Sequence, residues 1–358
     1  MEIKRRKTKK IRVGDIYIGG EAPVTVQTMV KVDAHDVKAV VRQIKEQEGA
    51  GGDITRMNVL DMESVKNFGA IKKEIKIPIV ADIHFNYEWA IEAVKQGVDK
   101  LRINPGNIGG VDRVKAVVKV CKERRVPIRI GVNAGSLEKD LLEKNGGHPT
   151  AEGLVESASR HIKILEDLDF DQTVVSIKSS DVRLMMGAYR LFSEKYDYPV
   201  HLGVTESGPP RKGTVKSSIG IGGLLEEGIG DTIRVSLAGD SREEIRVGRE
   251  ILKSLGLMKG PVLIACPTCS RTQFEMIPLV KKVEEYVDKL DVEIKVAVMG
   301  CVVNGPGEAR EADVGIAGGR GAGALFVKGK VIKPVKEEDM FEELVKMIDK
   351  IVKERRRK

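Results

Sequence analysis

Three cysteines near the C-terminal end of the chain are the residues best suited to bind a metal. Cys266 and Cys269 are three positions apart, and Cys301 follows 32 positions later, whereas Cys121 lies far upstream. All five histidines precede residue 202, so this region has no nitrogen ligand of its own. Structural zinc sites normally have four Cys or His ligands. Three thiolates with a replaceable or oxygen fourth ligand indicate instead an iron–sulfur cluster with one reactive iron.

The segment after Cys301 contains a candidate for the fourth ligand. The run Asn304-Gly-Pro-Gly-Glu308 is typical of a tight turn that could bring Glu308 back to the metal. A zinc site with the same ligands stays an alternative, although three cysteines and a carboxylate are an uncommon set for zinc. Cys121 shares one face of an amphipathic helical segment with three valines, which predicts a buried core thiol.

The net charge of +8 comes from the two ends of the chain. Residues 1–10 carry +5 and residues 353–358 carry +4, and subtracting both from +8 leaves about −1 for everything between. This distribution argues against an RNA-binding protein and against a nucleic-acid partner, and we expect the tails to serve solubility or thermal adaptation. The sequence has neither an apolar run long enough to span a membrane nor a signal-peptide pattern. We therefore expect a cytoplasmic protein without a membrane segment.

Eight short β-branched runs alternate with helical segments over the first two thirds of the chain. This alternation is typical of an α/β fold of the (β/α)8 TIM-barrel type. The segment 241–258 predicts the eighth helix, which ends at Lys259-Gly-Pro261. We expect residues 1–258 to form a barrel that binds a substrate diphosphate, and residues 259–358 to form a smaller α/β iron–sulfur domain. The eight runs are 24–29, 54–59, 77–84, 100–106, 127–133, 172–178, 199–206 and 231–237.

The alternation of side chains along the strands predicts a cationic barrel mouth. Barrel interiors are usually filled with Val, Ile and Leu, and active sites lie at the C-terminal ends of the strands. Asp53, Asp82 and Glu206 could form an internal salt-bridge network, but three carboxylates cannot balance five cations. Converging arginines favour a polyanion such as a diphosphate. The inward residues include Arg56, His84, Arg102, Arg129, Asn133, Lys178, Arg234 and Ser236, whereas the direction of Glu206 does not follow from the alternation.

These residues lie within longer motifs. The motifs are Val80-Ala-Asp-Ile-His-Phe85, Leu101-Arg-Ile-Asn-Pro-Gly-Asn107, Arg129-Ile-Gly-Val-Asn-Ala-Gly-Ser-Leu137, His201-Leu-Gly-Val-Thr-Glu206, Cys266-Pro-Thr-Cys269 and Met299-Gly-Cys-Val-Val-Asn-Gly-Pro-Gly-Glu308. In them, and over nearly its whole length, the chain closely resembles the GcpE family, the 4-hydroxy-3-methylbut-2-enyl diphosphate synthases of the methylerythritol phosphate pathway. The resemblance is to the short bacterial form.

The resemblance implies reductive opening and dehydration of 2-C-methyl-D-erythritol 2,4-cyclodiphosphate, with two electrons from a donor such as flavodoxin or ferredoxin. It implies a [4Fe-4S] cluster held by the three C-terminal cysteines and by Glu308, which yields its iron to the substrate. It also implies that Glu206 is an acid/base group and that Asn304 lies beside the cluster. The residues implied to hold the diphosphate are Arg56, His84, Arg102, Arg129, Asn133, Lys178, Arg234 and Ser236.

The length of the predicted eighth helix bears on assembly. Its eighteen residues, at ~1.5 Å each, span about 27 Å and would carry the chain from the barrel mouth to the opposite end. A three-residue linker cannot return the cluster to its own pocket, so we expect a head-to-tail homodimer in which each cluster caps the partner's barrel. The main alternative to the reductive synthase is a metal-independent phosphate-ester barrel enzyme, such as an aldolase or pterin-type synthase, with a structural zinc domain.

Overall fold

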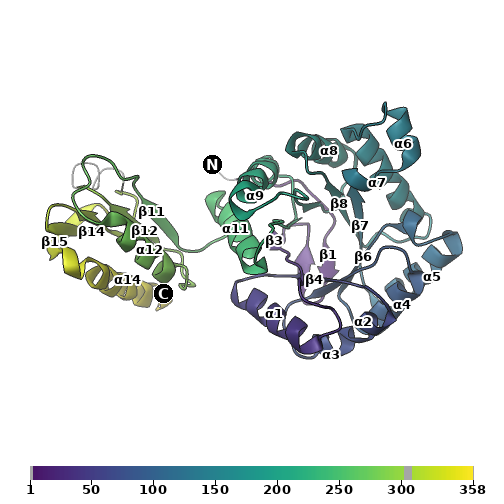
Figure 1. Cartoon of the computed structure of the whole chain (residues 1–358), viewed down its shortest axis with the longest axis horizontal. Helices are drawn as coiled ribbons and strands as arrows, with labels where there is room; N and C mark the ends of the chain where they lie inside the picture. The colour runs from purple at the N-terminus through teal and green to yellow at the C-terminus, as the bar shows by residue number, and fades with distance from the viewer. Residues whose placement is uncertain (1–2, 302–308, 358) are drawn as a thin grey trace. The chain divides into compact units, whose positions relative to one another are not determined.

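Figure 1 shows the computed structural model of the chain, which describes residues 3–301 and 309–357. The chain folds as two compact units, Met1–Met258 and Lys259–Lys358, each with its own hydrophobic core. Among the described residues, no helix combines the length and the apolar character needed to cross a membrane.

The first unit is a closed barrel of parallel strands, which confirms the predicted fold class (Figure 1). One parallel group runs from β4 to β8 in sequence order, and β9, β10 and β3 form a second group. Parallel bridges between Gln27 and Ile54 and between Val175 and Val200 join the two groups into a ring. The strands are β3 (Thr25–Val26), β4 (Thr55–Asn58), β5 (Ile79–Asp82), β6 (Lys100–Ile103), β7 (Ile128–Asn133), β8 (Thr173–Lys178), β9 (His201–Leu202) and β10 (Thr232–Ile233).

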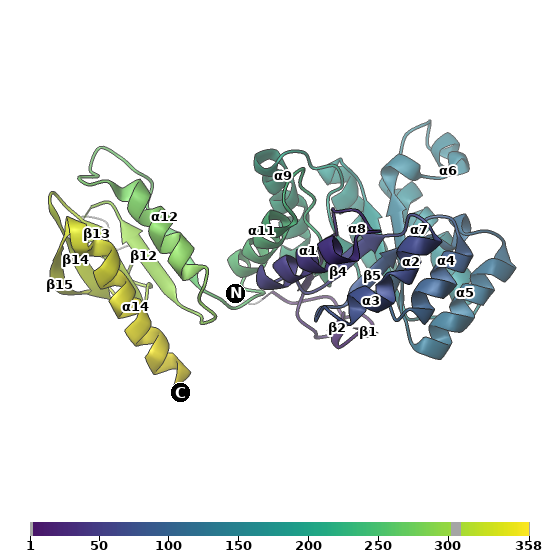
Figure 2. The same ribbon diagram turned by 60° about the horizontal axis from the view of Figure 1, so that its bottom comes forward.

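Helices surround the barrel, and their apolar faces supply most of its outer core (Figure 2). Several begin with an aspartate or asparagine that accepts hydrogen bonds from the first turn, as Asn86 does for α4 and Asp181 for α8. The helices are α1 (Val37–Gly49), α2 (Met62–Lys66), α3 (Phe68–Lys72), α4 (Tyr87–Lys95), α5 (Val111–Arg124), α6 (Lys139–Lys144), α7 (Ala151–Glu166), α8 (Val182–Lys195), α9 (Pro210–Ser217), α10 (Gly223–Glu226) and α11 (Ser241–Ser254).

Helix α11 runs from the pocket end of the barrel to the opposite end. Near its start, Glu244 Oε1 accepts a hydrogen bond from the N–H of Leu237, 3.0 Å away and just beyond β10. One turn from its end, Arg249 Nη1 donates to the carbonyl of Gly51, 3.1 Å away and just before β4. The helix ends at Ser254 and not at residue 258, so the prediction of its C-terminal boundary was wrong by four residues.

An N-terminal hairpin, which the sequence reading missed, forms the floor of the barrel. Strands β1 (Ile11–Val13) and β2 (Ile16–Ile18) pair antiparallel around a Gly14-Asp15 turn. Three buried residues of the hairpin pack against Ile54, Val80 and Val174 of the barrel strands. The alternating apolar pattern around Gly-Asp was a readable hairpin signal.

Basic residues at the two ends of the chain have structural partners. Arg5 pairs with Asp231 at 3.2 Å, and Arg6 donates to the carbonyls of Tyr196 and Tyr198. At the other end, Arg355 and Arg356 form ion pairs with Asp313 and Asp291. The N-terminal segment is therefore tied to the barrel, and the C-terminal helix is tied to its own sheet.

Within its described residues, the second unit is a five-stranded mixed sheet covered by two helices. The first three strands are parallel, and the last three form two antiparallel hairpins. The glycine-rich run at 318–323 lies at the turn between β13 and β14. The elements are β11 (Val262–Ala265), α12 (Met276–Val287), β12 (Lys295–Met299), β13 (Val314–Gly318), β14 (Ala322–Val327), β15 (Lys330–Lys336) and α14 (Met340–Arg356).

Candidate active site

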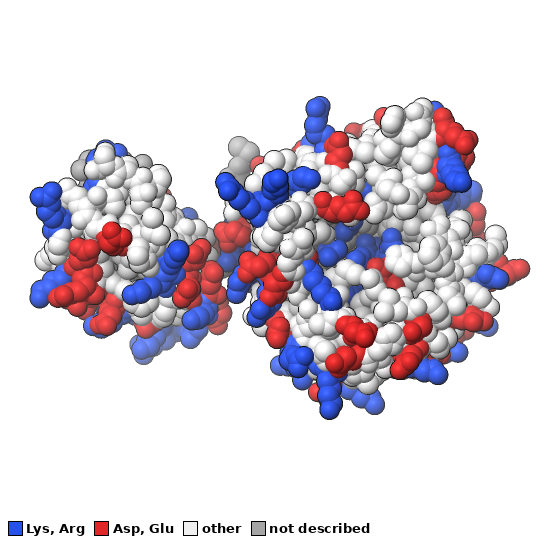
Figure 3. All heavy atoms as spheres, in the orientation of Figure 1, with Lys and Arg blue, Asp and Glu red and all other residues white. Residues whose placement is uncertain are grey.

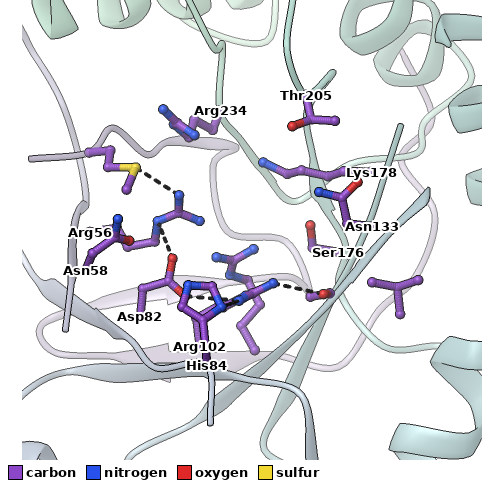
Figure 4. A pocket seen from close by; sticks show the side chains of 14 residues that line it. Arg56, Asn58, Asp82, His84, Arg102, Asn133, Ser176, Lys178, Thr205 and Arg234 are labelled. Atoms are coloured by element: carbon purple, nitrogen blue, oxygen red, sulfur yellow. Dashed lines mark hydrogen bonds and ion pairs between the residues drawn. The ribbon is translucent and has the colours of Figure 1, made fainter. Parts of the chain in front are cut away.

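A cationic pocket of about 230 Å³ lies at the C-terminal ends of the barrel strands. In Figure 3 its lysine and arginine atoms are visible inside a hollow in the middle of the first unit. Figure 4 shows side chains from different parts of the barrel converging on this space. The pocket is lined by Met29, Arg56, Asn58, Asp82, His84, Arg102, Arg129, Gly131, Val132, Asn133, Ser176, Lys178, Thr205 and Arg234.

Asp82 is the carboxylate in the centre of this lining, and it orients two arginines. Its Oδ2 lies 3.3 Å from Arg56 Nε and its Oδ1 lies 3.2 Å from Arg102 Nη1 (Figure 4). Burial of Asp82 raises the pKa of its carboxyl, but Arg56, Arg102 and Arg129 outweigh burial and lower that pKa to about 2. Asp82 is therefore ionised in the folded protein and holds both guanidinium groups toward the pocket.

Arg102 has two further contacts that fix its position. Its Nη2 donates to the carbonyl of Gly131 at 3.0 Å, and its Nη1 lies 3.0 Å from His84 Nδ1. A Cβ at Gly131 would lie 2.5 Å from Arg102 Nε, so the guanidinium packs directly on a position that must be glycine. The geometry fixes a planar donor group at one wall of the pocket, which suits bidentate binding of phosphate.

Of the three carboxylates considered for an internal salt-bridge network, Asp82 lines the pocket, whereas Asp53 and Glu206 do not. Asp53 accepts a hydrogen bond from the N–H of Val26 at 2.7 Å, outside the pocket lining. Glu244, which the sequence reading missed, lies 3.6 Å from Arg234 and 2.9 Å from Lys31. Glu244 is the fourth residue of α11 and is buried on the face of that helix that packs on the barrel, and its position on the apolar face of segment 241–258 was the signal for it.

Arg129 and Lys178 carry charge that the described residues do not pair. Arg129 is 1% exposed, and its Nε and Nη2 have no hydrogen-bond partner among the described residues. Burial lowers the pKa of Lys178 well below its usual range, and Arg234 and Arg129 lower it further. Cations in a low-dielectric cup repel one another strongly unless an anion neutralises them. The pocket is therefore built to bind a polyanion.

Seven of the eight residues predicted to face the barrel mouth line the pocket. The eighth, Ser236, and the predicted acid/base residue Glu206 are both described by the structure but lie outside the lining. Strand β10 ends at Ile233, so the alternation that places Arg234 inward does not extend to Ser236. Glu206 is exposed and has a φ of 51°, a left-handed conformation that turns the chain away from the strand direction. Its neighbour Thr205, three residues beyond the end of β9, lines the pocket instead, and its place near the end of the predicted run 199–206 was the available signal.

The candidate metal ligands lie at one edge of the second sheet. Cys266 directly follows β11 and Cys301 lies two residues beyond β12, its parallel neighbour, with Cys269 in the exposed loop between them. Gly300 donates its N–H to Cys266 Sγ at 3.1 Å, a contact that stabilises a thiolate. Asn304 and Glu308 lie outside the described residues. Within residues 3–301 and 309–357, no three His, Cys, Asp or Glu side chains are grouped closely enough to hold a metal ion.

The donor chemistry of this edge fits a soft metal centre. Three thiols come from adjacent strand ends and one loop, and thiolates favour iron–sulfur clusters or zinc. Cys121, by contrast, is fully buried in the barrel core, and burial raises the pKa of its thiol to about 12. Its predicted place in the core agrees with the structure.

Comparison with known proteins decides the family. The sequence model of the GcpE TIM-barrel domain matches residues 8–249, and that of the GcpE protein C-terminal domain matches residues 262–350. The chain belongs to the GcpE family. This confirms the resemblance found in the sequence motifs.

Relatives within the GcpE family cover nearly the whole chain. A Clostridium perfringens protein is 58% identical over 348 residues, which is 97% of this chain and 99% of the relative. A Thermodesulfovibrio yellowstonii protein is 57% identical over 349 residues, which is 97% of this chain and 100% of the relative. Both are named 4-hydroxy-3-methylbut-2-en-1-yl diphosphate synthase (flavodoxin).

Solved structures of dihydropteroate synthases share the barrel fold of this GcpE chain. The Yersinia pestis enzyme superposes with a TM-score of 0.52 at 11% identity, covering 69% of this chain and 98% of that one. The Stenotrophomonas maltophilia enzyme gives a TM-score of 0.52 at 12% identity, covering 70% and 97%. At such low identity the likeness shows the fold alone, and it does not favour the alternative of a pterin-type synthase.

Proposed function

We propose that the chain catalyses the reductive ring opening and dehydration of 2-C-methyl-D-erythritol 2,4-cyclodiphosphate to 4-hydroxy-3-methylbut-2-enyl diphosphate. The observation that carries this proposal is the cationic pocket, in which five arginine and lysine side chains surround Asp82 at the mouth of a GcpE-type barrel. The names of the relatives specify a diphosphate product and flavodoxin. We therefore take a cyclic diphosphate as the small-molecule substrate and flavodoxin as the electron donor.

The pocket residues divide into oriented and unpaired cations. Arg56 and Arg102 are held by Asp82, so they present guanidinium groups in fixed positions to phosphate oxygens. Arg129 and Lys178 have no comparable carboxylate among residues 3–301 and 309–357, so the substrate's negative charge would be their counter-charge. The remaining polar wall groups able to hydrogen-bond the diphosphate or the ring hydroxyls are His84, Asn133, Ser176, Thr205 and Arg234.

The cysteines of the second unit are proposed to hold a [4Fe-4S] cluster. Cys266, Cys269 and Cys301 supply thiolates, and Glu308 is proposed as an exchangeable fourth ligand. When bound, the cluster would deliver electrons one at a time and act as a Lewis acid toward the departing oxygen. Glu206 is proposed to move a proton at that oxygen and Asn304 to lie beside the cluster, in line with the family resemblance.

A head-to-tail homodimer is proposed to bring pocket and cluster together. Helix α11 ends at the barrel face opposite the pocket, and the second unit begins at Lys259, five residues beyond that end. The cluster edge of one chain is therefore proposed to cap the barrel of another, which gives two shared sites per dimer.

Mixed dimers test this arrangement. We expect Arg129→Met and Cys301→Ser chains to be inactive alone, but to recover activity when co-expressed, because one site per heterodimer then has an intact pocket and an intact cluster. Random mixing predicts about a quarter of wild-type activity per chain. Two differently tagged copies of the Arg129→Met chain serve as the control. A mixture as inactive as that control would contradict the shared site.

Metal analysis and activity test the reaction itself. Anaerobically purified protein should contain iron and sulfide and should convert the cyclic diphosphate with reduced flavodoxin. Cys301→Ser should lose both cluster and activity, whereas the matched Cys121→Ala change in the barrel core should keep both. Stoichiometric zinc without iron in active protein would overturn the cluster proposal and favour a metal-independent barrel enzyme.

A further inference from the structure

A second polar layer lies inside the barrel beneath the cationic pocket. The layer consists of Gln27, Lys100, Arg129, Ser176 and His201, from five different strands or strand ends, and each side chain is at most 1% exposed. Lys100 points inward, because it precedes Arg102 by two residues on β6 and Arg102 lines the pocket. Most barrels fill this level with branched apolar side chains.

Several polar atoms of this layer lack a hydrogen-bond partner among the described residues. They are both amide atoms of Gln27, Lys100 Nζ, Arg129 Nε and Nη2, Ser176 Oγ and His201 Nε2, all of them buried. His201 Nδ1 lies 3.4 Å from Thr232 Oγ1. Buried polar groups in folded proteins are nearly always satisfied, by protein or by ordered water. Ordered water at this level of the barrel would satisfy them.

The layer lies between an apolar floor and the pocket. Below it, the β1–β2 hairpin packs on Ile54, Val80 and Val174. Above it, Arg129 and Ser176 belong both to this layer and to the pocket lining. A ligand bound in the pocket would therefore lie next to the layer.

Lys100 is the group of this layer whose charge depends on its surroundings. It faces Arg129 from β7, Arg56 from β4 and His201 from β9. One carboxylate near it is that of Asp99, the residue directly before β6, which is paired with Lys72 and accepts the N–H of Ile79 at 2.8 Å. Burial lowers the pKa of Lys100 well below its usual range, and Arg129 and Arg56 lower it further.

We propose that Lys100 and the water around it form a proton store beneath the diphosphate pocket, which takes up a proton when a polyanion binds above and releases it when the polyanion leaves. The neutral amine gains one proton from solvent and becomes an ammonium ion, with no other bond made or broken. The bound anion favours the charged form, because it offsets the repulsion from Arg129 and Arg56. This inference rests on the proposed diphosphate pocket and adds a proton to its binding step.

Calorimetry of the cluster-loaded protein tests the proposal. Inorganic pyrophosphate and sulfate are titrated at pH 8 in buffers of different ionisation enthalpy, and the slope of the binding heat gives the number of protons taken up. Sulfate keeps its charge near this pH, so any proton taken up on binding it belongs to the protein. We expect wild type to take up about one proton more per bound anion than Lys100→Met or the polar variant Lys100→Gln. Lys119→Met, an exposed lysine on α5, should match wild type.

The outcomes separate the two proposals. Failure of wild type to bind either anion overturns the diphosphate pocket together with the store. Binding of sulfate without proton uptake overturns the proton store alone, and this wild-type result does not depend on how any variant folds. Equal proton uptake by wild type and by folded Lys100→Gln also overturns it, because the proton would then go to Lys178 or His84.

Discussion

Replacing Asp82 by asparagine should destabilise the barrel while leaving its shape intact. The carboxylate contacts Arg56 and Arg102 at 3.3 and 3.2 Å and has a pKa near 2, against an ordinary value of 3.8. That difference corresponds to roughly 2–3 kcal/mol of stability at neutral pH. Loss of one partner of a buried ion pair gives a similar figure, about 3–5 kcal/mol.

The pH dependence of the Asp82 contribution has a definite sign. The folded-state pKa lies below the unfolded value, so the stabilisation is fully present above pH ~4 and disappears as the pH falls toward 2. The stability difference between wild type and Asp82→Asn should therefore be constant from neutral pH down to about pH 5 and shrink below pH ~4.

Urea unfolding followed by tryptophan fluorescence measures the effect. Trp89 is the single tryptophan of the sequence, and it packs on the barrel core from α4, so its signal reports the first unit. The matched control is Asp240→Asn. Asp240 also has a pKa near 2 through Arg242, but its side chain is 41% exposed, so its ion pair contributes below ~1 kcal/mol. Asparagine also caps α11 about as well as aspartate.

Pyrophosphate should show whether the carboxylate of Asp82 and a bound anion balance the same cations. A bound polyanion supplies negative charge to Arg56 and Arg102, so the stability lost in Asp82→Asn should shrink when pyrophosphate is saturating. If Asp82→Asn and Asp240→Asn lost equal free energy of unfolding, the argument that burial strengthens the ion pairs of Asp82 would be refuted. A gap that pyrophosphate leaves unchanged would refute the claim that anion and carboxylate serve the same cations.

Three further predictions follow from single contacts. Gly131→Ala places a Cβ 2.5 Å from Arg102 Nε and should weaken pyrophosphate binding about tenfold by calorimetry, while the melting temperature falls by only a few degrees. In cluster-free protein, exposed Cys269 should react with a thiol reagent within minutes, whereas buried Cys121 should react only on unfolding; equal rates would contradict its place in the core. Tyr189→Phe removes a buried hydroxyl that joins β8 to β9, and urea unfolding should show a loss of about 1–3 kcal/mol.

The sequence was most informative where strands are regular. Alternation along β6 and β7 places Arg102, Arg129 and Asn133 inward, and all three line the pocket. The same rule failed at Ser236, because β10 is two residues long and the chain beyond it follows loop geometry. Glu206 could not be placed because its left-handed backbone depends on tertiary contacts and not on local pattern.

Other features were hidden because they depend on residues far apart in the sequence. The counter-charge of Arg234 comes from Glu244, which becomes a pocket neighbour only when α11 packs against β10. His201 looks like a strand residue of unknown direction until the ring closes around it. The sequence therefore predicts which charges enter the barrel, but not which partners they find there.

The chemical character of the pocket has a consequence for inhibitor design. A space of about 230 Å³ walled by guanidinium, ammonium and imidazole groups offers little apolar surface to a drug-like compound. Competitive ligands for it must carry several negative charges, and such compounds cross lipid bilayers poorly. Acidic groups placed to meet the guanidinium groups, in place of neutral mimics of the sugar ring, are the chemistry that this pocket requires of its ligands.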